Sequence, residues 1–564
     1  MRSNGIALVT TLALMVLIAL LVFSTFFRTQ IELWVTRNDT TSVQAFYAAE
    51  AGLQKYKAVL FQQYIWREQQ GQTGGGAGCY TSLVTGLDLD RNGNILRFND
   101  NQLPLTPPEG ETVVDADGQP IGRYTVTLIR DANDGQLFTL VSQGTSGGAK
   151  ATVQATVRLS NTGYLEQAIF AGTGQANKWL NGSATIRGGI YIVGDPNNPN
   201  ETVISANGNF DLLNWYDLNS YSDIAARVES AYRQVNDLCA SLRVQYGKIS
   251  VGGSTRLGEP DNKLKGVFVG RGKQDIIENK DSECNNTKGI CTEAMGPFDL
   301  SNPPAFPTLD AKLNSDACKD YSSWRACLQN KATLRIQRVG NVVSLAQPLG
   351  VTLNSSCLSA ISSGTLTLST SSVDCTFILN GVTQGFKYTY TSSGGKGKKA
   401  SGQGTLEIYG DVVLEGINLV FDKYTEYKAL SGSQKSATLA VLKLNGLGGN
   451  IDINDGLLPN ATHGLFPNHT LGLVAEGDVY QSGQYVMAPV YAGNTFRIEK
   501  DNVLFGSVIS NEFCTTSAGS RTDCNAGQKA EVVYVRIPQE NRPVLLPAIK
   551  GGTPVFQILS YERR

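Results

Sequence analysis

Hydrophobic residues are continuous near the start of the chain and alternate with polar residues further on. The run from Ile6 to Phe27 has 22 residues without a charge, which at ~1.5 Å per residue is enough to cross a hydrocarbon core of ~30 Å. No proline precedes Pro104, and no glycine lies between Gly5 and Gly52. The pattern predicts one continuous helix to about Gln62, roughly 85 Å long, whose first part spans a membrane. A secretory signal peptide is excluded because the run is too long and no cleavage site of small residues follows it.

A second pattern, of period two, follows a glycine-rich break at residues 71–78. It covers Tyr124–Arg130, Leu137–Gln143 and Ala149–Leu159, with turn sequences at residues 133–135 and 146–148 between them. Alternation between short turns is typical of antiparallel strands with one buried face. The sequence therefore predicts a three-stranded meander.

Short β-rich runs separated by glycine or Gly-Asp turns begin near Gly182. They are Ala184–Ile186, Ile190–Val193, Leu406–Tyr409, Val412–Leu414, Leu473–Ala475 and Val503–Ile509. No fixed repeat length relates these runs, so we expect either an irregular β-solenoid or a β-sandwich. One helix is expected to interrupt them, with a single apolar face formed by Ile224, Val228, Val235, Cys239 and Leu242.

The elements together predict an α+β chain. It has a long N-terminal helix with an antiparallel sheet and a large β-rich domain inserted in that part. The expected boundaries are 1–5 for a leader, 6–70 for the helix, 71–165 for the meander domain, 166–545 for the β-rich domain and 546–564 for a last strand. The alternative to an insertion is a C-terminal appendage, and the two differ in whether the last strand rejoins the meander.

The cysteine pattern indicates an oxidising compartment. Ten cysteines are present, and eight form near-neighbour pairs that we interpret as disulfides: Cys284 with Cys291, Cys318 with Cys327, Cys357 with Cys375, and Cys514 with Cys524. Cys79 and Cys239 remain, either bonded to each other or as separate thiols. Zinc is not expected, because neither histidine lies near a cysteine and no CxxC spacing occurs.

The N-terminal region carries a family resemblance. A leader ending in Gly5, the run that begins at Ile6, and the sequence Phe46-Tyr47-Ala48-Ala49-Glu50-Ala51-Gly52-Leu53 resemble the start of PilX-type minor pilins of type IV pili. The resemblance implies that a prepilin peptidase cuts after Gly5 and methylates Ile6. It also implies an inner-membrane location before assembly, a later place in the pilus, and other major and minor pilins as partners. Most pilins have a glutamate where this chain has Thr10, and this departure suggests a subunit at the pilus tip. An ordinary membrane anchor is the alternative.

One segment has the opening of a calcium loop. Asp88, Asp90 and Asn92 place oxygen side chains at alternate positions before a glycine, as a hard cation would require. The twelfth position is Asn99, so the closing carboxylate is missing. An Asx-rich turn without metal is the preferred interpretation, and no cofactor is expected.

Charge is distributed unevenly, although the net charge of the whole chain is only -1. The segment from Tyr321 to Leu406 has eight cationic residues and one acidic residue, Asp374. Lysines on a glycine-rich loop can follow phosphates, and neighbouring aromatic side chains can stack on bases. The predicted contacts with double-stranded DNA are Arg325, Lys331, Arg335, Arg338, Lys387, Tyr388, Tyr390, Lys396, Lys398 and Lys399. A solvated hairpin tip with aromatic residues in the core is the alternative.

The order of these parts is similar to that of competence minor pilins. That resemblance implies a β-rich lobe at the pilus tip that captures DNA without sequence specificity during natural transformation. An adhesin or structural minor pilin, which binds surfaces, glycans or other pili, is the second hypothesis. Enzymatic activity is not expected, because the chain has only two histidines, no GxSxG motif and few acidic residues near its basic block.

Overall fold

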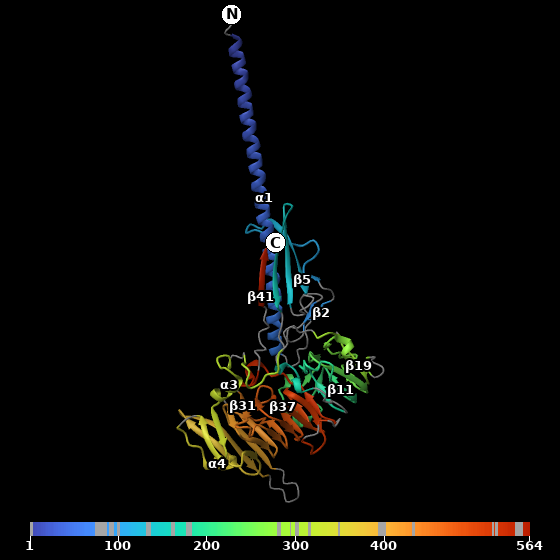
Figure 1. The fold of residues 1–564 in the computed structure, drawn as a ribbon, viewed down its shortest axis with the longest axis vertical. Coiled ribbons are helices and arrows are strands. Elements are labelled where there is room, and N and C mark those ends of the chain that lie inside the picture. The colour runs from blue at the N-terminus through green and yellow to red at the C-terminus, as the bar shows by residue number, and fades with distance from the viewer. Residues whose placement is uncertain are drawn as a thin grey trace.

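The computed structural model shows a long stalk that ends in a broad lobe (Figure 1). The structure describes residues 4–73, 87–89, 95–98, 102–130, 137–158, 164–175, 183–278, 284–293, 295–298, 304–313, 317–347, 350–392, 402–430, 435–521, 524, 528–547 and 557–563. The stalk is α1 (Asn4–Thr73), a single helix of 70 residues. It is longer than the predicted helix, which ended near Gln62. Apolar side chains from Leu8 to Val35 are exposed along it, and the helix is long and apolar enough to span a membrane.

The second half of α1 carries the predicted meander. β5 (Pro120–Arg130), β6 (Leu137–Ser146) and β7 (Ala149–Arg158) are antiparallel neighbours, which confirms the predicted meander. We call the sheet that contains these strands the pilin sheet, after the family that the N-terminal sequence resembles. Two short strands, β3 (Gln102–Pro104) and β4 (Glu111–Val114), pair with β5.

Small residues let the sheet lie close to the helix. Ala45, Ala48 and Ala49 are fully buried on the face of α1 that meets the sheet. A Cβ added to Gly144 on β6 would lie 2.0 Å from the carbonyl oxygen of Ala45 and 2.4 Å from the amide nitrogen of Ala49. Any side chain at residue 144 would therefore force strand and helix apart. The aromatic and aliphatic residues around this contact form a core of their own.

The last strand returns to the pilin sheet. β41 (Gln557–Arg563) pairs antiparallel with β7 and forms the edge of the sheet. The large β-rich region is therefore an insertion between β7 and β41. The C-terminus lies beside the middle of α1 (Figure 1).

The calcium candidate falls partly outside the described residues. β1 (Leu87–Leu89) pairs antiparallel with β2 (Ile95–Phe98), and Asp88 lies opposite Arg97. Asp90 and Asn92 belong to the segment that is not described. An antiparallel pair around this segment favours the Asx-rich turn, and calcium binding stays a prediction.

The insertion winds through three sheets, and we call strands β8 to β40 the coiled β domain. Sheet I contains β21 (Met295–Gly296), β18 (Gly266–Val269), β15 (Ser241–Val244), β10 (Ile190–Ile192), β8 (Ile169–Ala171), β39 (Val508–Thr516), β37 (Val490–Glu499), β34 (Thr470–Ala475), β31 (Ser436–Leu442), β28 (Val412–Glu415), β22 (Leu334–Val339) and β23 (Val342–Gln347). Sheet II contains β20 (Gly289–Ile290), β17 (Arg256–Leu257), β12 (Asp211–Leu213), β9 (Thr185–Arg187), β40 (Glu531–Val533), β38 (Val503–Phe505), β36 (Tyr485–Met487), β33 (Leu457–Pro459), β30 (Thr425–Ala429), β27 (Gln403–Tyr409), β26 (Val382–Thr391) and β25 (Val373–Leu379).

The third side consists of two groups of strands. Sheet III has β11 (Thr202–Gly208), β16 (Lys248–Gly253) and β19 (Ile276–Glu278) in one group, and β24 (Thr365–Leu368), β29 (Asn418–Phe421), β32 (Ile451–Ile453) and β35 (Val479–Gln481) with parts of β37 and β39 in the other. Strands of successive turns pair in parallel, for example β28 with β31 and β30 with β33. Parallel pairing distinguishes this arrangement from an antiparallel sandwich.

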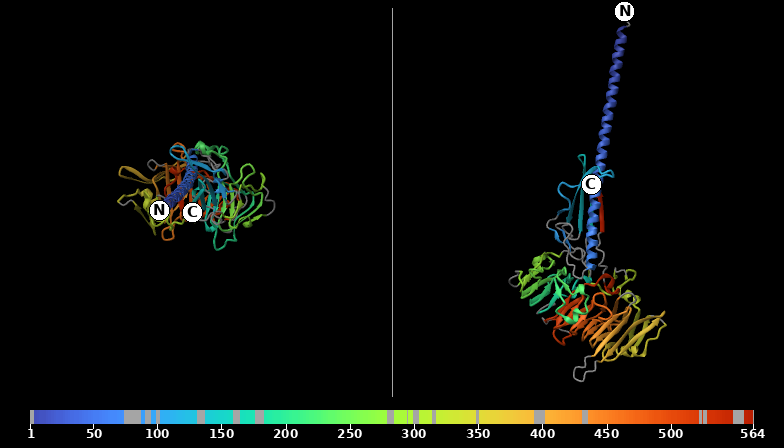
Figure 2. Two further views of the ribbon diagram at one scale, coloured as in Figure 1. Left: turned by 90° about the horizontal axis from the view of Figure 1, so that it is seen from above. Right: turned by 180° about the vertical axis from the view of Figure 1, so that it is seen from behind.

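The chain enters and leaves the coiled β domain in the middle of its sheets. The first half runs from β8 outward to β21 and ends there. The second half begins at the opposite end with β22 and returns to the middle, where β39 pairs with β8 and β40 pairs with β9. Gln175 (1% exposed) completes this closure, because its side-chain amide accepts from the Phe513 amide and donates to the Phe513 carbonyl. The two ends therefore lie on opposite sides of the stalk (Figures 1 and 2).

The turns of the coil differ in length. Val412, Leu439, Leu473, Val490 and Val508 occupy equivalent positions of sheet I, so the turns between them contain from 17 to 34 residues. This variation explains why the sequence shows no fixed repeat.

A segment that joins the two halves covers the outer face of sheet I. Phe306 stacks on Tyr491 at 5.9 Å, and Trp324 meets the same ring edge-on at 4.6 Å. The Tyr491 hydroxyl donates to the Pro307 carbonyl. This second hydrophobic core holds the segment that joins the two halves, including α3 (Trp324–Lys331), against sheet I.

The helix predicted for residues 224–242 is wrong. Helical structure is limited to α2 (Ser222–Ala225) and the 3-10 helix η3 (Ser230–Tyr232), followed by β14 (Gln234–Val235) and β15. β14 pairs with β13 (Tyr216–Asp217). Ile224, Val228 and Val235 are nevertheless buried. The apolar pattern therefore identified core residues correctly, although the backbone that carries them is not a helix.

Four disulfides lie between neighbouring cysteines. They are Cys284–Cys291, Cys318–Cys327, Cys357–Cys375 and Cys514–Cys524. Cys239 is also disulfide-bonded, and Cys79 lies outside the described residues. Within the described part of the chain, Glu512 with Cys514 and Cys524 is the cluster with metal-ligand geometry, but its two sulfurs are bonded to each other.

Candidate nucleic-acid interface

The predicted basic block forms one end of the coiled β domain. Arg325 and Lys331 lie on α3, Arg335 and Arg338 lie on β22, and Lys387 lies on β26. These elements begin the second half of the coil and close its end together with α4 (Ser355–Ile361). The block is therefore one region of the fold, divided between sheets I and II.

Arg325 does not offer a free charge. Its Nη1 and Nη2 donate to the two carboxylate oxygens of Glu476 at 2.9 and 2.6 Å, and Asp310 lies 3.3 Å from its Nε. Hydrogen bonds to Glu476 raise the pKa of Arg325, against the effect of burial. A bidentate pair of this kind satisfies the guanidinium. Arg325 therefore ties α3 to the coil, and we remove it from the predicted DNA contacts.

Arg335 has a similar structural role. Its Nη2 lies 2.8 Å from Glu415, whose side chain is only 1% exposed. Gln329 donates to the other oxygen of the same carboxylate at 2.5 Å. A buried carboxylate without its cation is strongly destabilising. Arg335 therefore neutralises the buried carboxylate of Glu415. We also remove it from the predicted DNA contacts.

Lys387 belongs to a row of alternating charges on sheet II. Asp374 lies opposite it on β25 and Glu407 lies opposite it on β27, while Lys428 follows on β30. Lys387 Nζ is 3.8 Å from Asp374, and Lys428 Nζ is 3.2 Å from Glu407. The Lys387 side chain is 46% exposed, so this lysine is partly balanced but accessible.

The predicted stacking aromatics are not free to stack. Tyr388 is fully buried and its hydroxyl donates to the Ser369 carbonyl at 2.9 Å. Burial raises the pKa of Tyr388 to about 12. Tyr390 is partly buried and packs against the same core. The alternative interpretation of this strand, in which its aromatic residues pack inward, is correct for Tyr388.

The remaining predicted contacts differ in how they are placed. Lys331 is exposed at the end of α3. Arg338 donates to the Ser362 carbonyl at 3.3 Å and to Asn341 Oδ1 at 3.4 Å. Lys396, Lys398 and Lys399 lie outside the described residues, in the loop between β26 and β27. The last residue pair of these two strands before the loop is Thr391 with Gln403.

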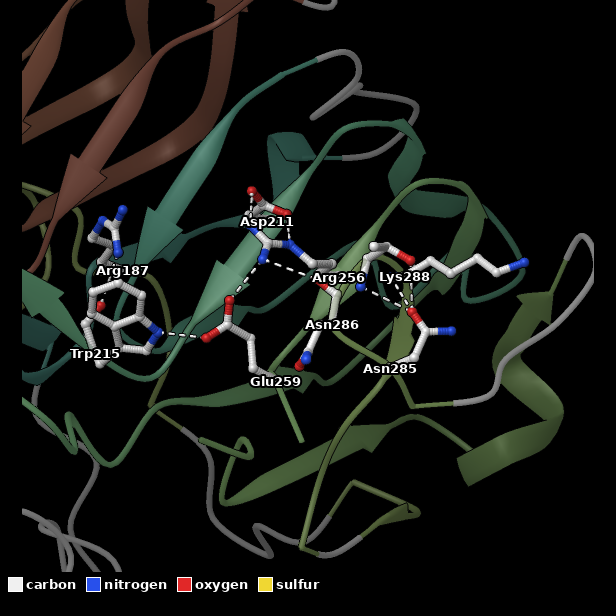
Figure 3. A network of polar contacts seen from close by, with 9 residues as sticks. Arg187, Asp211, Trp215, Arg256, Glu259, Asn285, Asn286 and Lys288 are labelled. Atoms are coloured by element: carbon white, nitrogen blue, oxygen red, sulfur yellow. Dashed lines mark hydrogen bonds and ion pairs between the residues drawn. The ribbon is translucent and has the colours of Figure 1, made fainter. Parts of the chain in front are cut away.

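A second polar network lies on sheet II in the other half of the coil (Figure 3). Arg256 donates to both oxygens of Asp211 at 2.7 Å and to Glu259 at 2.7 Å. Trp215 donates to the other oxygen of Glu259 at 2.7 Å, and the guanidinium of Arg187 lies 4.9 Å from the Trp215 ring. Hydrogen bonds to Asp211 raise the pKa of Arg256. Its charge is compensated, so this network stabilises the surface of sheet II and provides no phosphate site.

Counting charges along the sequence missed the acidic residues that tertiary contacts bring in. Asp310 precedes the basic block, and Glu407, Glu415 and Glu476 follow it. Glu415 and Glu476 lie in later turns of the coil, whereas Glu407 is the antiparallel neighbour of Lys387 on β27. Parallel stacking, which the sequence did not reveal, determines which turns become neighbours.

The predicted processing site lies at the start of α1. Gly5 and Ile6 are helical, and the hydroxyl of Thr10 donates to the Ala7 carbonyl at 3.0 Å. A threonine that bonds back to its own helix is compatible with an apolar environment. The position that carries a glutamate in most pilins is therefore a polar but uncharged part of the stalk.

Comparison with known proteins identifies a related pilin of known structure. The chain matches no protein-family model and no curated protein. Among solved structures it is similar to the crystal structure of the competence-associated pilin ComZ from Thermus thermophilus, with 68% sequence identity and a TM-score of 0.78. The match covers 93% of this chain and 97% of that chain. It therefore includes the lobe as well as the stalk.

Proposed function

The chain belongs to the family of the competence-associated pilin ComZ, and we propose that it is a minor pilin that captures extracellular double-stranded DNA at the tip of a type IV pilus. Capture serves uptake in natural transformation and does not depend on sequence. The observation that carries this proposal is the position of the basic hairpin β26–β27 at one end of a lobe that is held away from the membrane-spanning part of α1 (Figure 2).

Assembly follows the PilX-type pattern in this proposal. Prepilin peptidase removes the leader after Gly5 and methylates Ile6. Before assembly α1 holds the protein in the inner membrane, and afterwards the helix packs among other major and minor pilins. Thr10 in place of a glutamate suits a subunit with no neighbour above it. The parallel turns of the lobe support its interpretation as an irregular β-solenoid, and we infer a binding role without enzymatic activity.

The structure reduces the proposed DNA contacts. Lys331, Arg338 and Lys387 remain, together with the loop lysines Lys396, Lys398 and Lys399. Arg325, Arg335, Tyr388 and Tyr390 are removed from the proposed contacts, because their contacts are internal. Binding through five lysines and one arginine is expected to be electrostatic and independent of base sequence.

The test is binding of full-length protein in detergent micelles to random-sequence duplex DNA across a salt series. A variant with Lys387, Lys396, Lys398 and Lys399 changed to Ala is expected to lose affinity, and its log-log salt slope should flatten by about 0.9 for each phosphate that is no longer neutralised. The matched control replaces four exposed lysines elsewhere on the lobe, Lys263, Lys273, Lys500 and Lys529, and should retain the slope. Arg325→Ala should also retain the slope, because its charge is committed to Glu476.

An adhesin or structural minor pilin is the second candidate. The neutralisation of Arg325 and Arg335 favours it, because these ion pairs reduce the free positive charge at the end of the coil formed by α3, β22, β26 and α4, which we call the end cap. If wild type and both lysine variants bind DNA equally weakly at all salt concentrations, DNA capture fails. The pilin assignment then remains and the lobe would serve attachment to surfaces, glycans or other pili.

A further inference from the structure

One segment crosses the turns of the coil instead of belonging to any of them. We call residues 298–332 the strap, of which residues 298, 304–313 and 317–332 are described. The strap follows β21 at one end of sheet I and leads through α3 into β22 at the other end. It therefore runs along the axis of the coil, across the strands of sheet I.

A single row of side chains lies beneath the strap. The row takes one equivalent position from each of the neighbouring strands β10, β8, β39, β37, β34, β31 and β28. Its members are Tyr191, Phe170, Ile509, Tyr491, Val474, Ala440 and Val413, and at most 1% of each is exposed. All of them belong to the second hydrophobic core, together with apolar residues of the strap. The strap therefore covers one buried position on each of these strands.

Ring contacts fix the first part of the strap. Phe298 meets the ring of Tyr191 on β10 edge-on at 6.0 Å. Further along the strap, Phe306 stacks on Tyr491 of β37 at 5.9 Å, and the hydroxyl of the same tyrosine donates to the Pro307 carbonyl at 2.7 Å. β8 and β39 lie between β10 and β37. The strap thus follows the order of the strands beneath it.

Polar groups tie the second part of the strap to two further turns. Arg325 on α3 donates to both carboxylate oxygens of Glu476, which follows β34. Gln329 on α3 donates to Glu415 at the end of β28. These partners lie 151 and 86 positions apart in the sequence. The strap therefore connects turns that are not neighbours, in addition to the hydrogen bonds that each turn forms with the next.

The strap also contacts the two places where the lobe joins the stalk. At the entry, before β8, the Tyr164 hydroxyl donates to the Ala305 carbonyl at 2.7 Å. At the exit, after β40, the Leu545 carbonyl accepts from the indole of Trp324 at 2.9 Å. Tyr164 and Leu545 belong to the second hydrophobic core as well. Both ends of the coil are therefore connected through the strap to the attachment of the lobe on the stalk.

Without the strap the turns would be joined only weakly along the axis. Each unit of a repeat stack contacts only its neighbours, so such a stack can open from its end one unit at a time. In sheet II, β33 and β36 share a single residue pair in register, Leu457 with Val486. The pairs β27–β30, β30–β33 and β36–β38 share three to five. A load along the axis therefore meets few backbone hydrogen bonds at each step, unless another element bridges the turns.

We propose that the strap is a load-bearing element that transmits force from the ends of the lobe to the stalk and makes the coil yield as one unit. Its contacts with turns that are not neighbours must break together before a single turn can separate. A pilus that is withdrawn while its tip holds a cargo loads the lobe along this path. The role rests on the proposed place at a pilus tip, but not on whether the cargo is DNA or a surface.

Optical tweezers test this role with full-length protein in detergent micelles. Handles are attached through azidophenylalanine at Val382, which is exposed at the tip of the β25–β26 hairpin, and at Glu540, which is exposed after β40. Wild-type protein should yield in one step that releases on the order of 500 Å of chain, at ~3.5 Å per residue. Release of single turns from wild type, in steps of 17 to 34 residues, overturns the proposal.

A strap variant and a matched control separate the strap from general stability. Phe306→Ala with Tyr491→Phe removes the stacked ring and the hydrogen bond to Pro307, so release should occur in several steps of about 60–120 Å. Tyr485→Ala removes a partly buried ring from sheet II and should keep the single step. Denaturant unfolding of both variants compares their equilibrium costs, so that step number and stability are measured separately. Single-step release by the strap variant at the wild-type force contradicts the load-bearing role.

Trp324→Phe is a milder variant that keeps the test decisive if the double substitution prevents folding. It retains a ring but removes the indole donor to Leu545, so release should remain a single step at a lower force. An unchanged force would show that the strap does not carry load to the exit of the lobe. The measurement contains no DNA, so its failure leaves DNA capture standing, and failure of DNA binding leaves the strap result unchanged.

Discussion

The pilin sheet and the coiled β domain are both closed by strands that return from far along the chain, but they are held together differently. In the pilin sheet β41 completes an antiparallel sheet that packs on one helix. In the coiled β domain β39 and β40 complete two parallel sheets by meeting β8 and β9. The pilin part depends on close backbone packing, whereas the coil encloses one large hydrophobic core and is closed by polar groups that join turns distant in sequence.

The closure of the coil should be its most sensitive point. Glu166 precedes β8 and Arg542 follows β40, and the two form an ion pair in which the side chains are 6% and 8% exposed. The Tyr534 hydroxyl donates to the same carboxylate at 3.1 Å. Arg542→Ala should lower the free energy of unfolding by about 3–5 kcal/mol, because the carboxylate is left buried without its cation.

Hydrogen exchange in increasing denaturant measures this effect in each region. The coil should lose protection in the variant, while β5 to β7 keep theirs. Arg521→Ala is the matched control, because Arg521 is 55% exposed in its pair with Asp452 and should cost less than about 1 kcal/mol. Equal destabilisation by the two variants would show that the closure is not the weak point.

Acid should weaken the coil selectively. His469 is fully buried, and its Nε2 accepts from the Ala429 amide at 2.8 Å. Burial lowers the pKa of His469 to about 4. In the unfolded chain the pKa is ~6.5, so the unfolded state binds a proton between these values and the folded state does not. The contribution of neutral His469 to the free energy of unfolding is therefore complete above about pH 7. It decreases by on the order of 2–3 kcal/mol as the pH falls toward 4.

His469→Gln tests this assignment, because glutamine retains an acceptor but does not titrate. Unfolding free energies between pH 4 and 7 should depend less on pH in this variant than in wild type. His463→Gln is the control at the neighbouring, partly exposed histidine. The pilin sheet contains no histidine, so its exchange protection should show no step in this range. A step of equal size in both regions would contradict the assignment.

The pilin part should be most sensitive at its close contact. Gly144→Ala places a methyl group against the backbone of α1 and should destabilise the pilin sheet by about 1–3 kcal/mol. Gly296→Ala on β21 is the control, because its Cβ would meet nothing within 4 Å. Exchange protection in β5 to β7 should fall only in the first variant, and unchanged protection there would show that helix and sheet adjust without cost.

The same contrast explains how much the sequence predicted. The long helix and the meander follow from local patterns, because the antiparallel strands β5, β6 and β7 are joined by short turns. The four local disulfides connect cysteines within 18 residues of each other, so their spacing was informative. In the coil, however, neighbours lie one irregular turn apart or, for β8 and β39, 339 positions apart at Ile169 and Val508. Local patterns cannot indicate such pairings.

The candidate site shows the same limit. Lys387 and Tyr388 were both assigned to DNA because they lie in one aromatic and basic run. Alternation along β26 places Lys387 outside and Tyr388 in the core, a distinction that the period of a strand could have supplied. The partners of Arg325 and Arg335 could not be found in this way, because Glu476 and Glu415 become neighbours only through stacking of the coil.

The smallest expected effect concerns exposed ion pairs, of which each region has its own. Lys387→Ala should cost up to about 1 kcal/mol, because it interrupts the row formed by Asp374, Lys387, Glu407 and Lys428. In the pilin domain Lys55, 51% exposed, pairs with Glu111 at 2.6 Å, and Lys55→Ala should cost a similar amount. Denaturant unfolding of both variants measures the two values. A cost above about 2 kcal/mol for Lys387 alone would mean that the end cap depends on this lysine for stability, and its part in DNA binding would then have to be tested with Lys387→Arg.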